Sequence, residues 1–332
     1  MTTLKDIAAK VGVDVSTVSK VLQGAPIRVT EARRDEILRV AHEMDYRPNT
    51  LARSLRLRRS QAIAIVVPST TNFLYPEIIA GAEEAAEEQD YAMFLVKSNA
   101  SDPNSRLLSV AAQGRIDGLV FTDDYPHPPV EQRLCEMGIP FVSLNRGGGE
   151  DERTVILDDE AGFRTQAEYL VELGHRSVVF VAVQPRNFVA NLCLGAFRTG
   201  LSKRGVELPE SRVLGCDFEG DATEVVAEQL YALVPKPTAV ATASVLVASR
   251  LVQCLKNKGI SVPGELSVIG YHDSPAALWP PPGVTTVRMP SREQGRRGVM
   301  RLLQLIDGQK PGREVLAASP EIVERGTCSA VY

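Results

Sequence analysis

Residues 3–22, TLKDIAAKVGVDVSTVSKVL, decide how the rest of this chain is interpreted. Thr3 followed by Asp6 is typical of a helix N-terminus, and apolar residues then recur at helical spacing until Gly12. After a short turn, Asp14 can cap a second helix. The pattern predicts a helix-turn-helix, and the side chains expected to pack inward are Ile7, Ala8, Val11, Val18, Val21 and Leu22.

The outward face of the second predicted helix fits a DNA groove. In a helix-turn-helix the first residues of the second helix enter the major groove, where short hydroxyl and apolar side chains reach base edges and thymine methyls. The alternative is that two short amphipathic helices form part of an ordinary helical core, and periodicity alone does not separate the two. The outward side chains are Val15, Ser16, Thr17, Ser19 and Lys20.

The next residues favour DNA binding. Thr30 can cap a third helix over 31–44, with Ile37, Val40, Ala41 and Met44 on one face, and three such helices make a compact headpiece. Residues 1–60 hold 12 Lys or Arg against 7 Asp or Glu, whereas the remainder holds 25 against 34. A basic end on an acidic body fits contact with phosphates through that end.

The run at 3–22 and the later run TEARRDEILRVAHEMDYRPNTLARSLR, residues 30–56, resemble the LacI/GalR family of bacterial transcription regulators. The resemblance covers helix-turn-helix, third helix and linker in the family's order, and extends more weakly over nearly the whole chain. It implies a headpiece at 1–46, a hinge helix or linker at 47–60, and an effector-binding and dimerisation body at 61–332.

The segment after the headpiece is too short and polar to hold a helix unaided, so a flexible basic linker is one interpretation. The resemblance implies instead a hinge helix that forms on DNA, in which Ala52 allows close approach and Leu55 wedges into the minor groove and bends the duplex. The DNA-binding residues that we then expect are Thr3, Val15, Ser16, Thr17, Ser19, Lys20, Asn49, Ala52, Arg53, Leu55 and Arg56.

Composition narrows the class of protein. The chain of 332 residues is 44% hydrophobic, enough for a sizeable core, and it shows neither a membrane-length apolar stretch nor a signal peptide. We therefore expect a cytoplasmic location and no membrane partner. The 5 cysteines are scattered without the spacings that bind zinc or mark redox pairs, so no metal and no cofactor are expected.

From residue 62 onward, short apolar runs alternate with helical stretches, which predicts α/β structure with parallel, doubly wound sheets. One sheet of all the strands is possible. The resemblance implies a two-lobed body like that of periplasmic binding proteins, with an N-lobe at about 61–158 and 288–315 and a C-lobe at about 159–287 and 316–330. The expected strands are 63–67, 92–96, 118–121, 141–144, 177–183, 239–243, 266–270 and 284–287, and the expected helices include 76–89, 160–173 and 224–233.

Polar residues follow most of these strands, and open α/β sheets bind ligands beyond the carboxyl ends of their strands. Loops are usually polar, so only the set as a whole is informative. The residues expected to bind an effector in a cleft between the lobes are Asn72, Phe73, Asp123, Asn145, Arg146, Asn187, Cys193, Phe218, Ser244, His272 and Trp279.

The cleft departs from that of sugar-binding family members. Cys193 stands where the family's Arg precedes a helix, Ser244 replaces an Asn, and His272 replaces an Asp. Asn145 also replaces an Asp, while Phe218 takes the place of a ring that stacks on the ligand. Losing an Arg and two acids removes the groups that fix vicinal hydroxyls, so we expect an effector other than a simple free sugar.

His272 can exchange one hydrogen bond with a ligand when neutral, and at mildly acid pH it would pair with an anionic ligand. It can equally be an ordinary loop residue. A degenerate cleft, with regulation passed to a protein partner or to none, is also open.

The sequence thus predicts a homodimeric transcription regulator, most simply a repressor, that binds double-stranded operator DNA and is tuned by a small molecule. Whether that molecule induces or corepresses is not set by the sequence. An α/β nucleotide-binding enzyme is the alternative from another class, but neither Gly-x-Gly-x-x-Gly nor a Walker lysine follows a strand, and no catalytic residue is expected. The carboxylate pairs Asp123-Asp124 and Asp158-Asp159 have no His at ligand spacing.

Overall fold

In the computed structural model the chain forms two compact units, Met1–Arg59 and Ser60–Tyr332. The structure describes residues 2–22, 24, 26–46, 59–68, 75–98, 105–122, 128–144, 153–183, 188–217, 222–279, 281–317 and 319–331.

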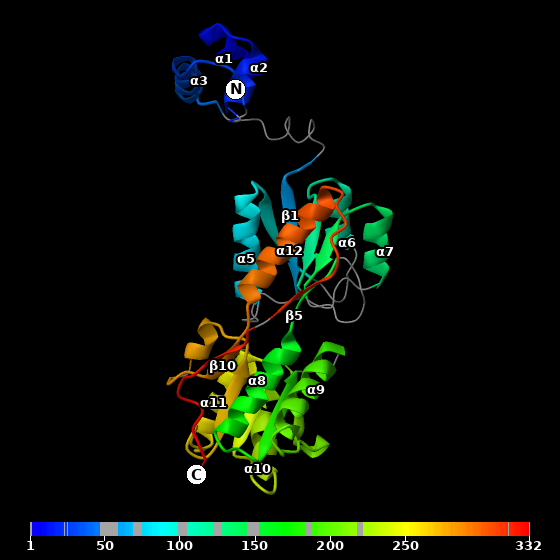
Figure 1. Ribbon diagram of the computed structural model, residues 1–332, viewed down its shortest axis with the longest axis vertical. Coiled ribbons are helices and arrows are strands. Elements are labelled where there is room, and N and C mark those ends of the chain that lie inside the picture. Colours follow the sequence, from blue (N-terminus) through cyan, green and yellow to red (C-terminus); the bar gives the residue numbers. More distant parts are fainter. Residues whose placement is uncertain are drawn as a thin grey trace. The chain divides into compact units, whose positions relative to one another are not determined.

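The first unit is a three-helix headpiece made of α1 (Leu4–Val11), α2 (Val15–Leu22) and α3 (Glu31–Glu43) (Figure 1). The Thr3 hydroxyl accepts a hydrogen bond from the Asp6 amide, and the Asp6 carboxylate accepts one from the Thr3 amide at 2.8 Å, which closes a capping box. Gly12 ends α1 with a φ of 72°, a left-handed conformation that glycine adopts without strain. The predicted helix-turn-helix is confirmed.

The third helix also matches its prediction closely. The Thr30 hydroxyl accepts a hydrogen bond from the Arg33 amide, and the helix ends at Glu43, one residue earlier than expected. Apolar side chains from all three helices meet in one core, whose buried members are Ile7, Ala8, Val11, Val18, Val21, Ile37, Val40 and Ala41.

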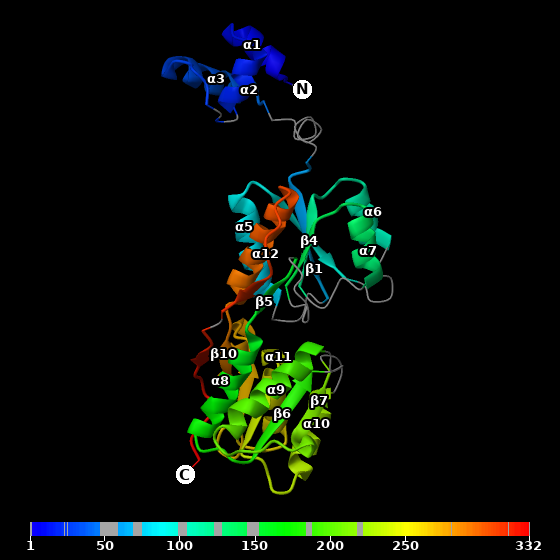
Figure 2. The same cartoon turned by 45° about the vertical axis from the view of Figure 1, so that its right-hand side comes forward.

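The second unit contains two large sheets, each covered on both faces by helices, and a small two-stranded sheet of β5 (Val155–Leu157) and β11 (Glu314–Leu316). The first, which we call the N-lobe, has the strand order β2-β1-β3-β4, all parallel. Helices α5 and α12 pack on the face that carries Ile63, Ile65 and Val67, and α6 and α7 on the opposite face (Figures 1 and 2). The N-lobe elements are β1 (Ala62–Val67), α5 (Tyr75–Glu88), β2 (Ala92–Lys97), α6 (Ser105–Ala112), β3 (Gly118–Phe121), α7 (Pro128–Glu136), β4 (Phe141–Ser143) and α12 (Ser291–Ile306).

The other sheet, which we call the C-lobe, has six strands in the order β12-β10-β9-β8-β6-β7. Helices α8 and α9 cover one face, and α10 and α11 cover the other. All pairs are parallel except β12 with β10, so one edge departs from the all-parallel prediction. The elements are α8 (Asp159–Glu172), β6 (Val178–Val183), α9 (Phe188–Ser202), β7 (Val213–Cys216), α10 (Ala222–Ala232), β8 (Ala239–Thr242), α11 (Val245–Asn257), β9 (Ser267–Tyr271), β10 (Thr285–Arg288) and β12 (Glu321–Val323), with two 3-10 turns, η1 (Glu210–Arg212) and η2 (Pro275–Leu278).

The chain crosses between the lobes at three places. Two crossings are the short strands β5 (Val155–Leu157), which precedes α8, and β11 (Glu314–Leu316), which precedes β12. These two strands pair in parallel with each other. The third crossing joins β10 to α12 through Met289 and Pro290. These crossings lie at one end of the C-lobe sheet, where they bring residues far apart in sequence together.

All eight predicted strands are present, each within one residue at both ends, but the one-sheet alternative is wrong. Four strands were not predicted: Val155–Leu157, Val213–Cys216, Glu314–Leu316 and Glu321–Val323. They have only three or four residues and bury few side chains, so their apolar pattern is weak. Among the described residues, no helix is long and apolar enough to span a bilayer.

Candidate nucleic-acid interface and effector site

The outward face of α2 carries the residues that were predicted to read DNA. Val18 is fully buried and Val21 nearly so, which fixes the rotation of the helix. Val15 therefore points outward with 38% of its surface exposed, and Ser16 and Lys20 are exposed beside it. Thr17 and Ser19 are half-buried at the sides of this face.

Hydrogen bonds join α3 and the residue after it to the N-terminal part of the headpiece, in addition to the apolar core that supports α2. The Arg33 guanidinium donates to the carbonyl oxygen of Val11 at 3.2 Å and pairs with Glu36 at 2.9 Å. The Thr2 hydroxyl donates to the carbonyl oxygen of Met44 at 2.8 Å, joining the two ends of the headpiece. The headpiece thus presents a short, exposed helix face with apolar and hydroxyl side chains, the form required for entry into a major groove.

Thr3 is exposed, but its hydroxyl already belongs to the capping box of α1. The remaining predicted DNA contacts, Asn49, Ala52, Arg53, Leu55 and Arg56, lie outside the described residues.

Among the predicted effector residues, the structure describes Cys193, Ser244, His272 and Trp279, and the other seven lie outside the described residues. Those seven are Asn72, Phe73, Asp123, Asn145, Arg146, Asn187 and Phe218.

His272 follows β9 and lies beside the crossing into α12. Its backbone is left-handed, with a φ of 61°, and its Nδ1 is 3.5 Å from the Ser291 hydroxyl at the start of that helix. Desolvation lowers the pKa of His272 to about 4, although part of the residue is still reached by solvent. The lowered pKa favours the neutral imidazole at mildly acid pH, and pairing of His272 with an anionic ligand stays a prediction.

The buried Tyr271 and the half-buried Asp159 pair with each other next to His272, a contact that the sequence reasoning missed. The Tyr271 hydroxyl donates to the Asp159 carboxylate at 2.9 Å, and the Tyr271 ring stacks on Phe163 with 3.8 Å between centroids. Desolvation raises the pKa of Asp159 to about 6, and the charge of Asp158 adds to the shift. The sequence offers only a weak signal, since Asp159 belongs to a carboxylate pair and Tyr271 ends an apolar run.

Cys193 lies within α9 and not ahead of a helix, which corrects the expected placement. Its side chain is buried in the C-lobe core, and desolvation together with the nearby Asp159 raises the pKa of the thiol, which is therefore uncharged. A neutral, buried group thus takes the place where family members were expected to have a guanidinium.

Ser244 and Trp279 differ in their surroundings. The Ser244 hydroxyl caps α11 by accepting a hydrogen bond from the Leu246 amide at 3.2 Å, so its side chain has a structural partner. Trp279 follows the 3-10 turn η2 and is 71% exposed.

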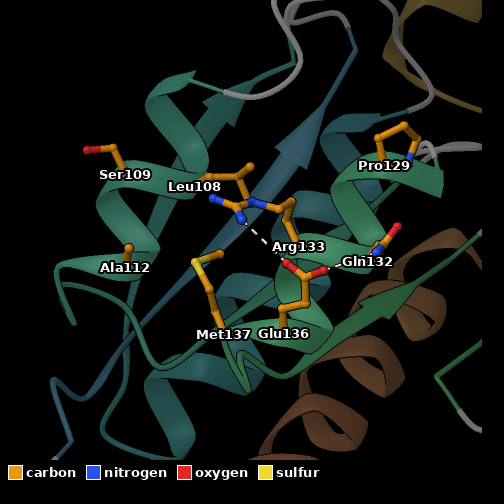
Figure 3. Close-up of a pocket in the computed structure, with 8 residues that line it drawn as sticks. All are labelled: Leu108, Ser109, Ala112, Pro129, Gln132, Arg133, Glu136 and Met137. Carbon is orange, nitrogen blue, oxygen red and sulfur yellow. Dashed lines mark hydrogen bonds and ion pairs between the residues drawn. The ribbon is translucent and has the colours of Figure 1, made fainter.

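A separate hollow of about 610 Å³ lies on the N-lobe between α6 and α7 (Figure 3). Leu108 and Met137 reach it from the two sides, while the Arg133 guanidinium donates to the Glu136 carboxylate at 3.4 Å within it. It contains none of the predicted effector residues. Across the described part of the chain, no three His, Cys, Asp or Glu side chains form a group that could hold a metal ion.

Comparison with known proteins agrees with this arrangement. Residues 3–49 match the model for "Bacterial regulatory proteins, lacI family", and residues 167–328 match "Periplasmic binding protein-like domain". The transcriptional regulator CelR of Thermobifida fusca is 31% identical over 335 residues, covering 98% of each chain. The transcriptional repressor PurR of Vibrio parahaemolyticus is 29% identical over 330 residues, again covering 98% of each.

Solved structures show the same likeness. A CelR–cellobiose complex superposes with a TM-score of 0.74 at 28% identity, covering 98% of this chain and 100% of that one. The lac repressor dimer bound to operator and the anti-inducer ONPF gives 0.79 at 24% identity, covering 99% of each, which is a likeness of fold.

A helix-turn-helix headpiece joined to a two-lobed body defines a DNA-binding transcription regulator. The chain belongs to the LacI family of bacterial regulatory proteins. Members of that family are regulators, which decides against the α/β enzyme alternative.

Proposed function

We propose that this protein is a cytoplasmic repressor that binds operator DNA as a homodimer and whose affinity for the operator is set by a small molecule held between the lobes. The observation that carries the proposal is the exposed face of α2, with Val15, Ser16 and Lys20 on a three-helix support. CelR and PurR, a regulator and a repressor by name, support the regulatory role.

The homodimer follows from the size of one recognition helix, because one headpiece reads only a half-site and two are needed for a palindromic operator. The N-lobe has a surface suited to self-association. Phe94 and Leu95, on the edge strand β2, are 54% and 50% exposed, an arrangement that in a monomer would favour uncontrolled strand pairing.

Val15→Tyr and Ser16→Gln are expected to change which operator sequence is preferred while leaving non-specific DNA affinity within about twofold. These side chains would contact base edges, where one changed contact alters discrimination by about 1–3 kcal/mol, whereas phosphate contacts carry non-specific affinity. Selection of bound sequences from a random pool, followed by titrations at fixed salt, measures both quantities. Sedimentation of the same complexes gives the number of chains per operator.

Lys10→Gln is the matched control and should retain the wild-type preference, because Lys10 lies in α1 with its ammonium 3.9 Å from the Glu43 carboxylate of α3. Equal losses on every sequence for both α2 variants would show that Val15 and Ser16 do not read bases.

For the effector, we propose a molecule other than a simple free sugar, because a neutral thiol and a neutral imidazole stand where sugar-binding relatives were expected to have charged groups. The CelR–cellobiose complex makes cellobiose the natural sugar against which to test this.

A thermal-melting screen of the full chain should therefore show no shift with cellobiose or hexoses, and a shift with a sugar phosphate, polyol, nucleobase or amino acid. A ligand at a hundred times its Kd adds roughly 2.7 kcal/mol to the folded state, which a melt detects. Tight binding of a hexose or cellobiose would contradict the proposed class. A response to none would favour a cleft controlled by a protein partner.

A further inference from the structure

The junction between the linker and the body is held by the side chain of Asp117, the residue directly before β3. The Ser60 amide and the Ser60 hydroxyl both donate to Oδ1 of Asp117, at 2.7 and 2.9 Å. The Gln61 amide donates to the other carboxylate oxygen, Oδ2, at 2.9 Å. Both oxygens of a residue 56 positions away in sequence are thus used to hold the first two residues of the body.

We call the three hydrogen bonds from Ser60 and Gln61 to Asp117 the clamp. The backbone on both sides of the clamp is held by further hydrogen bonds. The Ala92 amide donates to the Gln61 carbonyl oxygen at 2.9 Å, and the Asp117 amide donates to the Ala62 carbonyl oxygen at 2.7 Å. Gln61 itself has a φ of 53°, a left-handed conformation that a residue with a side chain rarely adopts. Such a conformation persists only where surrounding bonds impose it, and here the Asp117 carboxylate supplies one of them.

The clamp lies where the linker enters the body, so it can affect the linker as well as the local fold. Ser60 is the first residue of the second compact unit, directly after the segment that joins the unit to the headpiece. A loose junction would absorb movement of the N-lobe before that movement reached the linker.

We propose that Asp117 is a positioning residue for DNA binding, which makes the root of the linker a rigid part of the N-lobe so that the state of the body sets the placement of the linker. This inference rests on the proposed function as an operator-binding regulator. The carboxylate suits the task because it accepts several hydrogen bonds at once with charge assistance. An Asn at this position would have one acceptor oxygen and would turn an amide group toward the donors.

The test compares the full-length wild type with Asp117→Asn and Ser60→Ala. Operator and non-specific DNA affinities are measured by titration, and hydrogen exchange is measured for the backbone amides of residues 60–62. For Asp117→Asn we expect at least tenfold faster exchange at these amides, at least tenfold weaker operator binding, and non-specific binding within twofold. Ser60→Ala removes the hydroxyl, which donates to Asp117 and also hydrogen-bonds the backbone of Ala62, and it keeps both backbone donors to Asp117. Its loss of operator affinity should therefore be about twofold to threefold.

Asp90→Asn is the matched control. Asp90 is an exposed acid on the same lobe, also in a left-handed conformation with a φ of 58°, which Asn tolerates well. It should match the wild type in all three measurements.

The outcomes separate the two proposals. A wild type that prefers no DNA sequence overturns the proposed function itself. A wild type that prefers an operator, with Asp117→Asn binding it equally well, overturns the clamp. Loss of affinity on every DNA in parallel shows a merely structural role and also overturns it. If Asp117→Asn fails to fold, Ser60→Ala decides, since its unchanged operator affinity would contradict the inference and its selective loss would support it.

Discussion

Gly81→Ala should destabilise the body by about 3 kcal/mol, the upper part of the range for overpacking a closely fitted interior. Helices α5 and α12 cross so closely at this point that a Cβ on Gly81 would run into the carbonyl oxygen of Arg292. On the partner helix, a Cβ on Gly295 would meet the carbonyl oxygen of Ile78 in the same way. Both obstacles are backbone atoms, which cannot rotate away, so the helices would have to separate.

Urea unfolding monitored by circular dichroism measures the change. Gly195→Ala in α9 is the control, because a Cβ there meets nothing within 4 Å and alanine is favoured over glycine in a helix by up to about 1 kcal/mol. The control should be neutral or stabilising, and a Gly81→Ala protein as stable as the control would contradict the close crossing. The exposed pairs of Arg292 with Glu84 and Arg296 with Glu88 would not rescue the variant, since such pairs contribute little.

Asp159→Asn should stabilise the body by about 2 kcal/mol above pH 7, because the carboxylate is held where ionisation is unfavourable. The pKa of Asp159 is raised from 3.8 to about 6. Because the pKa of Asp159 is higher in the folded state, the protonated side chain stabilises the folded protein fully below pH 3.8. This stabilisation is lost as the pH rises through about 6. The asparagine cannot ionise, and its oxygen still accepts the hydrogen bond from Tyr271.

The free energy of unfolding at pH 4, 5.5, 7 and 8 checks this prediction. The difference between variant and wild type should be smallest at pH 4, grow between pH 4 and 7, and stay constant above. Asp90→Asn is the control, since Asp90 is exposed on the N-lobe and asparagine tolerates its left-handed backbone, which has a φ of 58°. A difference that does not depend on pH would show that Asp159 ionises freely.

The headpiece could be predicted almost completely from the sequence because its structure depends on local signals. Thr3, Gly12 and Thr30 mark helix ends, and the apolar spacing fixes which faces pack, so the exposure of Val15 and Ser16 followed directly. The longer strands of the body were equally visible as apolar runs.

What could not be predicted depends on contacts between distant residues. Tyr271 and Asp159 are 112 residues apart, and neither is unusual among its neighbours in sequence. Asp117 lies in an ordinary polar turn before a strand, and only the pairing of β1 with β3 brings it to Ser60. The lowered pKa of His272 could not be predicted for a related reason, because desolvation depends on all the elements that surround a group and not on its own segment.

The place of α12 has a consequence for synthesis of the chain. This helix supplies Val299 and Leu302 to the N-lobe core, yet it is made only after nearly the whole C-lobe has been translated. Until residue 306 has left the ribosome, the face of β1 that carries Ile63 and Ile65 lacks part of its cover. The usual order, in which the earlier lobe of a nascent chain is completed first, is therefore reversed here. The hydrophobic core of the N-lobe can be completed only late, after the larger part of the C-lobe has become available to fold.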